Sequence, residues 1–228
     1  MTKQVVTLNV DGYAPAITAF TFPLLAAYAE KIGADFRVIT TRKWPEAPPV
    51  YEKLQLYEMA AERDWTIYFD ADALVHPDMP DVTEHIGKDT VMFNGADLAS
   101  NRITYDRFFR RDGRNIGACN WFTVASDWCR ELWEPLSDIT IPEAIARIHP
   151  TVNERGTVIT ADHLIDDFVL SRNIAKYGLK HARWTQVLIS IGQGGTIYLW
   201  HEYTMPIDEK VVAIRKTLAD WHIRVGKA

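Results

Sequence analysis

The chain opens with two strand-like segments separated by a helix-like segment. Residues 5–10 (VVTLNV) are apolar and β-branched, and Asp11 and Gly12 mark a turn after them. Residues 15–32 carry apolar side chains at helical spacing and stop before Gly33. Residues 35–40 (DFRVIT) again have the pattern of a strand. This order of strand, helix and strand predicts a parallel sheet with helices on its faces.

Further along the chain, short apolar runs alternate with segments of helical spacing. We expect strands at 65–69, 90–94, 120–125 and 196–200. We expect helices at 51–63, 127–136, 162–177 and 208–225, the last with Asp208 as its N-cap. We interpret the arginine-rich stretch between residues 96 and 117 as a surface excursion. The sequence predicts one α/β domain over residues 1–228, with three α/β/α layers around a central, mostly parallel sheet.

The composition is that of an ordinary globular protein. Hydrophobic residues make up 47% and charged residues 24% of the chain, which excludes disordered, collagen-like and coiled-coil classes. The net charge of −5 excludes a global basic field for nucleic acid. No run of about 18 apolar residues exists, so we expect no transmembrane segment. Cys119 and Cys129 cannot build a disulfide framework and are compatible with a reducing compartment, so we expect a cytoplasmic location.

The strongest indication of chemistry is a pair of acidic residues at the end of a buried strand. Asp70 and Asp72 follow the apolar run WTIYF. Residues i and i+2 of an extended chain point to the same side, so both carboxylates can face one point at the carboxyl end of the sheet. Converging carboxylates repel each other, and a hard divalent cation such as Mg²⁺ or Mn²⁺ removes the repulsion. We therefore interpret the pair as metal ligands that would hold a diphosphate; a helix N-cap or a turn is the structural alternative.

A histidine stands at the end of the last strand-like run. His201 comes directly after TIYLW, which follows the glycine-rich segment 192–195. A neutral imidazole is a good third ligand for Mn²⁺. A lone histidine is more often structural, but Asp70, Asp72 and His201 together form a set of two carboxylates and one imidazole, each at the end of a strand.

These motifs resemble, in their order, those of the GT-A glycosyltransferases, in particular the retaining enzymes similar to glycogenin, to bacterial lipopolysaccharide galactosyltransferases and to fungal and plant mannosyl- and xylosyltransferases. The resemblance spans roughly residues 5–205. Five segments carry it: TLNVDGY at 7–13, YEKLQLY at 51–57, YFDADALV at 68–75, NIG at 115–117 with WFTV at 121–124, and IYLWH at 197–201. The Asp-x-Asp motif alone has low specificity, and its order with the flanking segments raises that specificity.

The resemblance implies an enzyme that transfers a sugar from a nucleotide-diphosphate sugar, with UDP-sugars and retention of anomeric configuration favoured. It implies that Mn²⁺ or Mg²⁺, held by Asp70, Asp72 and His201, stabilises the departing diphosphate. It divides the domain into a donor-binding half at about 1–95 and an acceptor-side half at about 96–228. The acceptor stays open between a glycan, a protein, a small molecule and a modified nucleic acid, and so does the oligomeric state.

The resemblance also implies roles for residues around the donor. The residues expected to bind the donor are Asn9 and Tyr13 at the base, Lys53 at the diphosphate or a sugar hydroxyl, Ala71 between the two acids, and Asn115 and Gly117 in the pocket wall. Asn9 has an equal alternative as a turn residue, and Lys53 as a residue on a solvated helix face. Trp121 could stack on a sugar, but core packing is the preferred interpretation.

An acidic cluster at 162–167 is the second catalytic candidate. Related enzymes carry an acidic or amide residue near the anomeric carbon at the start of such a helix, and Asp166 or Asp167 matches this position. Sequence alone does not separate the two, and a solvated acidic helix start is the alternative. The chain departs from the family after His201, where glycogenin-like enzymes have Gly and then a diphosphate-binding Lys. Here the next lysine is Lys210, for which a plain helix position is the preferred interpretation.

Two other functions compete with sugar transfer. A haloacid-dehalogenase-like phosphatase would use Asp70 as nucleophile, Asp72 as general acid and Ser126 as the hydroxyl at the end of a second strand. That family, however, usually places its Asp-x-Asp motif at the start of the fold and has no use for His201. A non-catalytic nucleotide-sugar-binding module is the second alternative, and it would bind the donor without turnover.

Overall fold

The computed structural model describes residues 1–97, 116–153 and 155–223. The arginine-rich stretch at 102–114 and the predicted pocket residue Asn115 lie outside the described residues. Within the described part of the chain, no helix has both the length and the apolar character that crossing a membrane requires.

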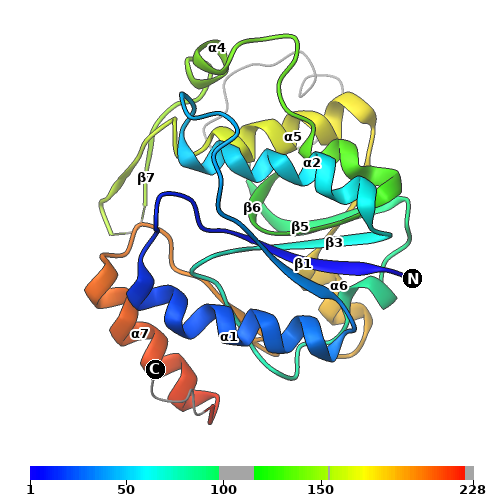
Figure 1. The fold of residues 1–228 in the computed structure, drawn as a ribbon, viewed down its shortest axis with the longest axis vertical. Helices are drawn as coiled ribbons and strands as arrows, with labels where there is room; N and C mark the ends of the chain where they lie inside the picture. Colours follow the sequence, from blue (N-terminus) through cyan, green and yellow to red (C-terminus); the bar gives the residue numbers. More distant parts are fainter. Residues whose placement is uncertain (98–115, 154, 224–228) are drawn as a thin grey trace.

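A six-stranded sheet forms the middle layer (Figure 1). In spatial order its strands are β2 (Asp35–Ile39), β1 (Lys3–Leu8), β3 (Trp65–Asp70), β6 (Ile116–Ser126), β5 (Thr90–Asp97) and β9 (Lys180–Arg183). Strand β6 runs antiparallel to β3 and β5. The pairs β1–β2, β1–β3 and β5–β9 are parallel. The prediction of a mostly parallel central sheet is therefore confirmed.

Helices cover both faces of this sheet (Figure 1). One face carries α1 (Pro15–Lys31) and α6 (Trp184–Ser190), and α7 (Ile207–Asp220) packs on α1. The other face carries α5 (Ile165–Tyr177), α2 (Leu56–Met59) and the 3₁₀ segments Pro49–Gln55, Ala60–Glu62 and Asp127–Trp133. The short helix α4 (Ile141–Ile145) lies near α5, and a 3₁₀ turn spans Val82–Glu84. The predicted three-layer arrangement is thus confirmed.

The alternation of side chains along the strands decides which helix meets which face. Val5 of β1 and Phe69 of β3 pack in one apolar cluster with Leu25 of α1. Val6, the next residue of β1, packs in the opposite cluster with Phe168 of α5. Because the period is two, Asp70 lies on the α5 side of the sheet, one residue beyond Phe69. This alternation places Asp70, the first acid of the motif, beside the start of α5.

Two short strand pairs lie outside the main sheet. Strand β10 (Leu199–Trp200) pairs antiparallel with β4 (Leu74–Val75), which follows β3. A late segment of the chain therefore returns to the carboxyl end of β3. Strands β7 (Thr151–Val152) and β8 (Val158–Ile159) form a hairpin that the sequence pattern did not predict. Its tip is joined to the segment after β10 by a hydrogen bond from Asn153 Nδ2 to Thr204 Oγ1 over 2.6 Å.

Several predicted helices differ from those observed. The helix expected at 51–63 is mostly 3₁₀, because four consecutive residues from Tyr51 to Leu54 are buried, which an amphipathic surface α-helix does not allow. The helix expected at 127–136 is also a 3₁₀ segment, and α5 begins at Ile165 rather than at 162. The N-cap of α7 is Pro206, and Asp208 lies in its first turn.

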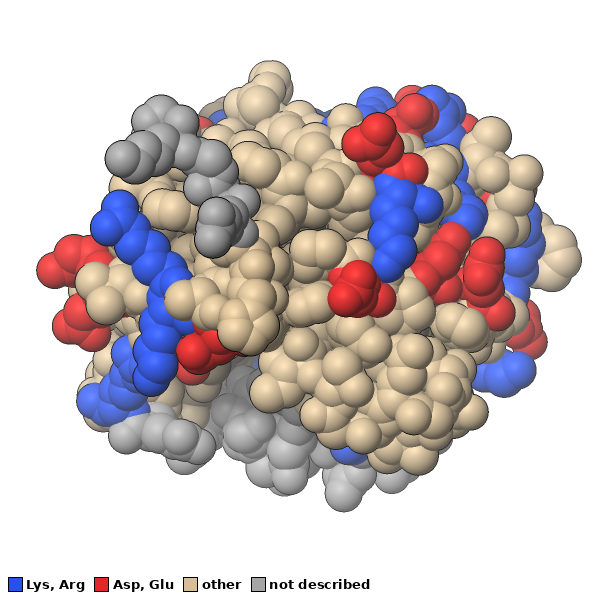
Figure 2. Space-filling view, turned by 90° about the horizontal axis from the view of Figure 1, so that it is seen from below, with Lys and Arg blue, Asp and Glu red and all other residues tan. Residues whose placement is uncertain are grey.

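Charges of both signs are distributed over the surface. Figure 2 shows one face of the molecule, on which Lys and Arg lie next to Asp and Glu, with uncharged surface between these groups. This face therefore carries no broad single-sign field of the kind that holds a nucleic acid backbone.

Candidate active site

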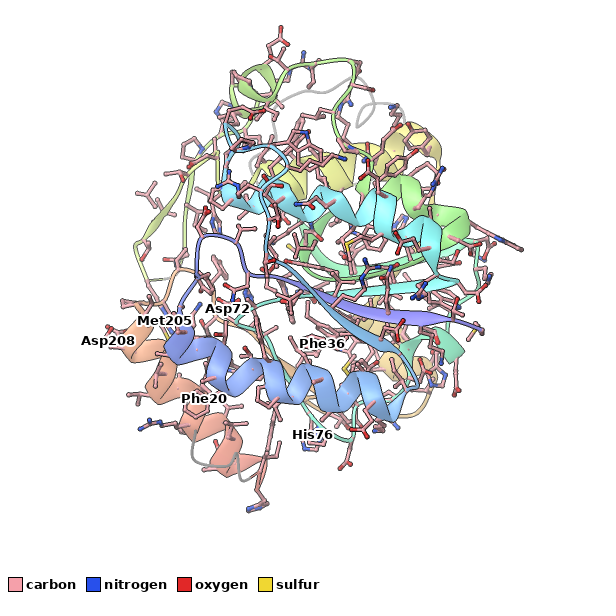
Figure 3. The ribbon with its side chains drawn as sticks, viewed as in Figure 1. Phe20, Phe36, Asp72, His76, Met205 and Asp208 are labelled. Atoms are coloured by element: carbon pink, nitrogen blue, oxygen red, sulfur yellow. The ribbon has the colours of Figure 1, made fainter. Side chains whose placement is uncertain are left out.

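A cavity of about 820 Å³ opens at the carboxyl ends of β1 and β3. Its wall includes the loop after β1, the segment from Pro49, the end of β3, the start of α5, strand β7 and the chain between β10 and α7. Figure 3 places Asp72 at this end of the sheet, near Met205 and the start of α7. Open α/β sheets bind ligands at the carboxyl ends of their strands, and this volume falls within the range of small-molecule sites, about 300–1,000 Å³.

Asp70 ends β3 with one carboxylate oxygen bound by the protein. The Tyr68 hydroxyl donates a hydrogen bond to Asp70 Oδ1 over 2.6 Å, because residues two apart on a strand share a side. Lys53 Nζ lies 2.7 Å from the same oxygen. The other oxygen, Oδ2, lies 3.7 Å from His201 Nε2. Asp70 therefore turns one oxygen to the lysine and the other to the imidazole.

The short β4–β10 pair brings His201 to the acidic motif. Trp200 is paired with Leu74, so His201 follows that pair directly and lies beside the turn that holds Asp72. His201 Nε2 is 3.2 Å from Asp72 Oδ1. One ligand atom each of Asp70, Asp72 and His201 lie within 4.8 Å of one another. The structure thus brings together the three residues that the sequence assigns to a metal, although binding itself stays a prediction.

The chemistry of this donor set fits Mn²⁺ or Mg²⁺. Asp70 Oδ2 and Asp72 Oδ1 both face His201 Nε2, which gives two hard oxygen ligands and one imidazole ligand. The two remaining carboxylate oxygens are bound by lysine side chains. A divalent cation would therefore take one oxygen from each carboxylate without displacing either lysine.

Lys210 belongs to the site, although the sequence favoured a plain helix position for it. Its residue is 3% exposed, and its Nζ lies 2.5 Å from Asp72 Oδ2. The Tyr13 hydroxyl donates to the same oxygen over 3.1 Å. Burial alone would raise the pKa of Asp72, but His201 and Lys210 hold that pKa well below its usual value. Asp72 is therefore a carboxylate at neutral pH.

A signal for Lys210 was present in the sequence. Lys210, Ile214 and Leu218 follow one another at four-residue spacing, and all three are buried. A lysine on the apolar stripe of an amphipathic helix has to find a buried partner for its charge. The stripe therefore singles out Lys210 as the lysine of α7 that needs a carboxylate.

Lys53 is buried at the centre of the acidic groups. Its Nζ lies 2.7 Å from Asp70 Oδ1 and 2.8 Å from Asp166 Oδ2, and it donates to the backbone oxygen of Asn120 over 3.0 Å. Burial alone would lower the pKa of Lys53, but Asp166 and Asp70 raise it above its usual value. The interpretation of Lys53 as a solvated helix residue is therefore wrong, because its segment packs inward.

The structure separates Asp166 from Asp167. Asp166 is 3% exposed and forms the ion pair with Lys53. Asp167 accepts a hydrogen bond from the backbone N–H of Asn120 over 2.6 Å, and Lys53 acts on it only through its charge, without an ion-pair contact. Burial by the surrounding protein, together with the charge of Asp166, raises the pKa of Asp167 well above its usual value. Both carboxylates line the cavity, but Asp167 is the one disposed to carry a proton.

Replacing Asp167 by asparagine is expected to stabilise the protein at neutral pH. A carboxyl whose pKa is raised on folding destabilises the fold increasingly as pH rises above about 4. The amide oxygen of D167N can still accept from Asn120, so thermal unfolding at pH 7 should occur roughly 2–4 °C higher. The exposed neighbour Asp162 provides the control, since D162N should leave the midpoint unchanged. A midpoint lowered by D167N at pH 7, or a difference that shrinks as pH rises from 5 to 8, would contradict this assignment.

The loop after β1 contributes Asp11 and Tyr13 to the cavity wall but not Asn9. The backbone N–H of Asn9 donates to Ile39 oxygen over 2.8 Å, which continues the β1–β2 ladder. This bond fixes the backbone of Asn9 at the end of β1, while its buried side-chain oxygen Oδ1 has no hydrogen-bond partner among the described residues, so a contact of Asn9 with the base stays a prediction. Tyr13 is 40% exposed at the cavity, where its hydroxyl meets Asp72.

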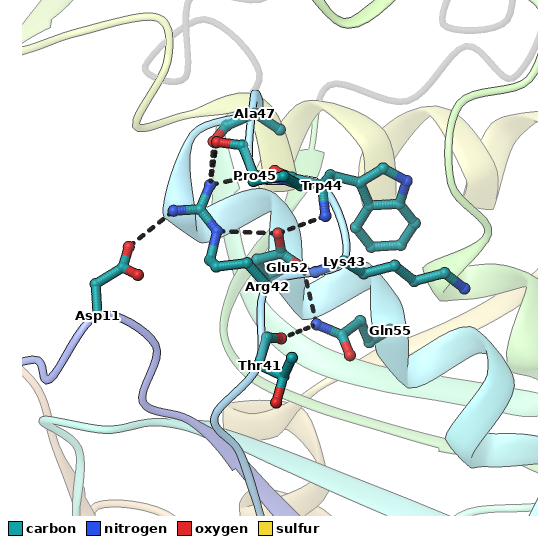
Figure 4. A network of polar contacts seen from close by, with 9 residues as sticks. All are labelled: Asp11, Thr41, Arg42, Lys43, Trp44, Pro45, Ala47, Glu52 and Gln55. Atoms are coloured by element: carbon teal, nitrogen blue, oxygen red, sulfur yellow. Dashed lines mark hydrogen bonds and ion pairs between the residues drawn. The ribbon is translucent and has the colours of Figure 1, made fainter.

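A buried glutamate organises the neighbouring wall (Figure 4). Glu52 accepts hydrogen bonds from Arg42 Nε and from the backbone N–H groups of Lys43 and Trp44. Arg42 in turn donates to Asp11 Oδ2 over 2.8 Å and to the backbone oxygen of Ala47. This network fixes the loop before Pro49 and orients Asp11 at the cavity.

The remaining predicted donor residues have mixed positions. Ala71 lines the cavity between the two acids, and its backbone oxygen accepts from Thr21 Oγ1 over 2.5 Å. Gly117 pairs with Ala96 between β6 and β5 and is not part of the cavity wall, because the wall is reached only two residues later in β6. Asn120, rather than Gly117, lines the cavity from this strand, and no sequence motif had indicated it.

Asn120 carries an amide group that is not satisfied within the described residues. The residue is 1% exposed and lines the cavity, yet its Nδ2 has no hydrogen-bond partner in this part of the chain. Its Oδ1 accepts from Thr123, its N–H is bound by Asp167, and its backbone oxygen by Lys53. A buried N–H group without a partner is costly, so Nδ2 is available for a polar group of a bound ligand.

Comparison with known proteins finds similarity in structure only. No protein-family model and no curated protein matches the sequence. A glycosyltransferase involved in glycosylation of the major capsid of PBCV-1 matches with a TM-score of 0.53 and 11% identity, over 93% of this chain and 99% of that one. The bifunctional glycosyltransferase WbbM matches with a TM-score of 0.51 and 9% identity, over 94% of this chain and 51% of that one.

The galactosyltransferase LgtC, solved with donor and acceptor sugar analogues, matches with a TM-score of 0.49 and 12% identity, over 93% of this chain and 95% of that one. This likeness is weaker than the other two. The first two matches extend over nearly the whole chain and confirm the resemblance at the level of the fold. The protein therefore has the GT-A glycosyltransferase fold, with its acidic motif at the end of the third strand.

Proposed function

We propose that this protein is a metal-dependent glycosyltransferase that takes its sugar from a nucleotide-diphosphate donor. The observation that carries the proposal is the convergence of Asp70, Asp72 and His201 in the cavity of a GT-A fold. A UDP-sugar as donor and retention of configuration rest on the resemblance of the motifs alone. The acceptor is left open.

The residues around the cavity have different roles that suit this chemistry. When bound, Mn²⁺ or Mg²⁺ would supply positive charge where the departing diphosphate becomes negative. Lys210, on Asp72, adds a fixed ammonium at the same end of the cavity. A charge that is already in place when the transition state forms stabilises it without reorganisation.

The opposite side of the cavity suits the transferred sugar. Asn120 Nδ2 is a free donor for a sugar hydroxyl. Asp166, paired with Lys53, would lie where a developing oxocarbenium centre needs a carboxylate. Asp167, with its raised pKa, can exchange a proton with a hydroxyl of the sugar or the acceptor.

A thermal-shift panel tests the proposal. UDP-glucose, UDP-galactose, UDP-N-acetylglucosamine and GDP-mannose are each added with Mn²⁺, with Mg²⁺ and with EDTA. At a donor concentration of about 100 times Kd, we expect stabilisation of about 2.7 kcal/mol, which corresponds to roughly 5–10 °C, and only with metal.

Two variants sharpen this test. D70N should lose the metal-dependent shift, and D78N should keep it, because Asp78 has a side chain 84% exposed after β4. A panel without any shift, or a shift equal with Mn²⁺ and with EDTA, would count against the proposal. A shift that comes without any release of UDP would instead favour the non-catalytic binding module.

The arrangement of Ser126 speaks against the phosphatase alternative. Ser126 is paired with Trp65 at the start of β3, whereas Asp70 ends that strand. The two residues are five steps apart along the strand, about 16 Å. Ser126 Oγ is also bound to the backbone of Lys88 and Trp128. Ser126 therefore lies at the opposite end of β3 from Asp70. A haloacid-dehalogenase-like site requires this hydroxyl beside Asp70.

A further inference from the structure

Metal-binding histidines are usually oriented through their second ring nitrogen. That nitrogen donates to a carboxylate, a backbone oxygen or a water, and the hydrogen bond fixes both the tautomer and the plane of the ring. In the described part of the chain, His201 has polar contacts only through Nε2, with Asp70 and Asp72. A cause other than a hydrogen bond to a described residue can therefore orient this ring.

The indole of Trp121 supplies that cause. The rings of Trp121 and His201 are stacked, with centroids 4.9 Å apart and an angle of 10° between their planes. The contact follows from the sheet register, since Phe122 is paired with Phe69 and Trp121 is therefore the residue opposite Asp70. A flat indole against the imidazole restricts rotation of the ring and keeps Nε2 directed at the two carboxylates.

We propose that Trp121 is a positioning residue for the metal site, which holds the His201 ring in its ligating orientation by stacking rather than by a hydrogen bond. The inference rests on the proposed function only in taking Asp70, Asp72 and His201 as metal ligands. Trp121 lines the cavity and is only partly buried, and it also packs against the apolar cluster that contains Phe122 and Trp184.

Binding of Mn²⁺ alone, measured by the electron paramagnetic resonance signal of the free ion, tests this inference. W121L keeps an apolar side chain but removes the flat ring, and should weaken Mn²⁺ binding by about tenfold or more. W121F keeps a flat ring and should stay within about threefold of wild type. W128L is the matched control, because Trp128 is 67% exposed and outside the cavity wall, and it should bind like wild type.

A double-mutant cycle distinguishes positioning from a general structural effect. In the H201A background the imidazole is gone, so adding W121L should change Mn²⁺ affinity by less than about twofold. A general loosening of the cavity would weaken Mn²⁺ binding by the same factor in both backgrounds. Equal factors, or wild-type affinity in W121L, would overturn the inference.

Nuclear magnetic resonance of the His201 ring gives a readout that needs no metal. The indole face shifts the His201 Hε1 resonance upfield, and this shift should be absent in W121L, with H201A used to assign the signal. An unshifted resonance in the wild-type protein would show that the rings do not stack in solution. A wild-type protein that binds no Mn²⁺ overturns the metal site and this inference together. A protein that binds Mn²⁺ but transfers no sugar contradicts only the proposed function.

Discussion

Replacing Asp70 by asparagine is expected to lower the Mn²⁺-dependent release of UDP from a UDP-sugar by a factor of about 10³. The neutral amide replaces one of the two carboxylates that face His201 Nε2, which are the proposed metal ligands. Stabilisation of the leaving diphosphate is then lost in the transition state. Slow hydrolysis of the donor without an acceptor provides the measurement, so the acceptor need not be known.

Asp70 is the better of the two acids for this experiment. In D70N, Lys53 keeps Asp166 as an ionic partner, so the fold should be retained. In D72N, the buried Lys210 would lose the carboxylate that lies 2.5 Å from it, and reduced stability would obscure the effect on the rate. D78N is the control, because Asp78 is an exposed acid that follows β4. A D70N protein that hydrolyses the donor at the wild-type, metal-dependent rate would exclude Asp70 as a ligand.

The fold and the convergence of Asp70, Asp72 and His201 could be predicted because both depend on local pattern. Strand periodicity and the order of strand and helix determine a parallel sheet, and the ends of its strands share one edge. Asp70 and Asp72 follow a mainly apolar strand, and His201 follows another, so their type and position were visible. The contact between His201 and Asp72 then depends only on the β4–β10 pair.

The rest of the site depends on long-range packing that has no local pattern. Lys53 meets Asp166 across more than a hundred residues of sequence, and only the packing of the Pro49 segment on α5 brings them together. Trp121 lies opposite Asp70 because of the antiparallel register of β3 and β6, which no local residue pattern predicts. Asn9 shows a further limit, since the ladder hydrogen bond of its backbone does not decide what its side-chain oxygen binds.

The largest effect on stability is expected for Lys53→Met. The variant leaves the partly buried Asp70 and the buried Asp166 without the ammonium that lies 2.7 and 2.8 Å from them. Breaking a buried ion pair by removing one partner costs about 3–5 kcal/mol, because an uncompensated charge remains. The midpoint of thermal unfolding should fall by roughly 10 °C. K43M is the control: Lys43 pairs with Glu58 at the surface, where such pairs contribute less than about 1 kcal/mol.

The pH dependence of this loss has a defined sign. The pKa of Lys53 is raised on folding, so the ion pair contributes its full stability below the unfolded value of about 10.4 and loses it only as pH rises through the folded pKa. The difference between K53M and wild type should therefore stay constant from about pH 8 to about pH 10. A difference that disappears within that range would mean that Lys53 is not charged in the folded protein.

A second substitution decides whether charge or packing explains the K53M defect. D166N alone removes one of the two carboxylates that hold Lys53 and should destabilise the protein. In the K53M background the same change removes one of the uncompensated negative charges and should restore part of the lost stability. Opposite signs in the two backgrounds are expected only if the cluster is held by charge balance. If D166N lowered stability equally in both backgrounds, the defect of K53M would lie in the packing of its methylene chain, and Lys53 would not be the electrostatic centre of the site.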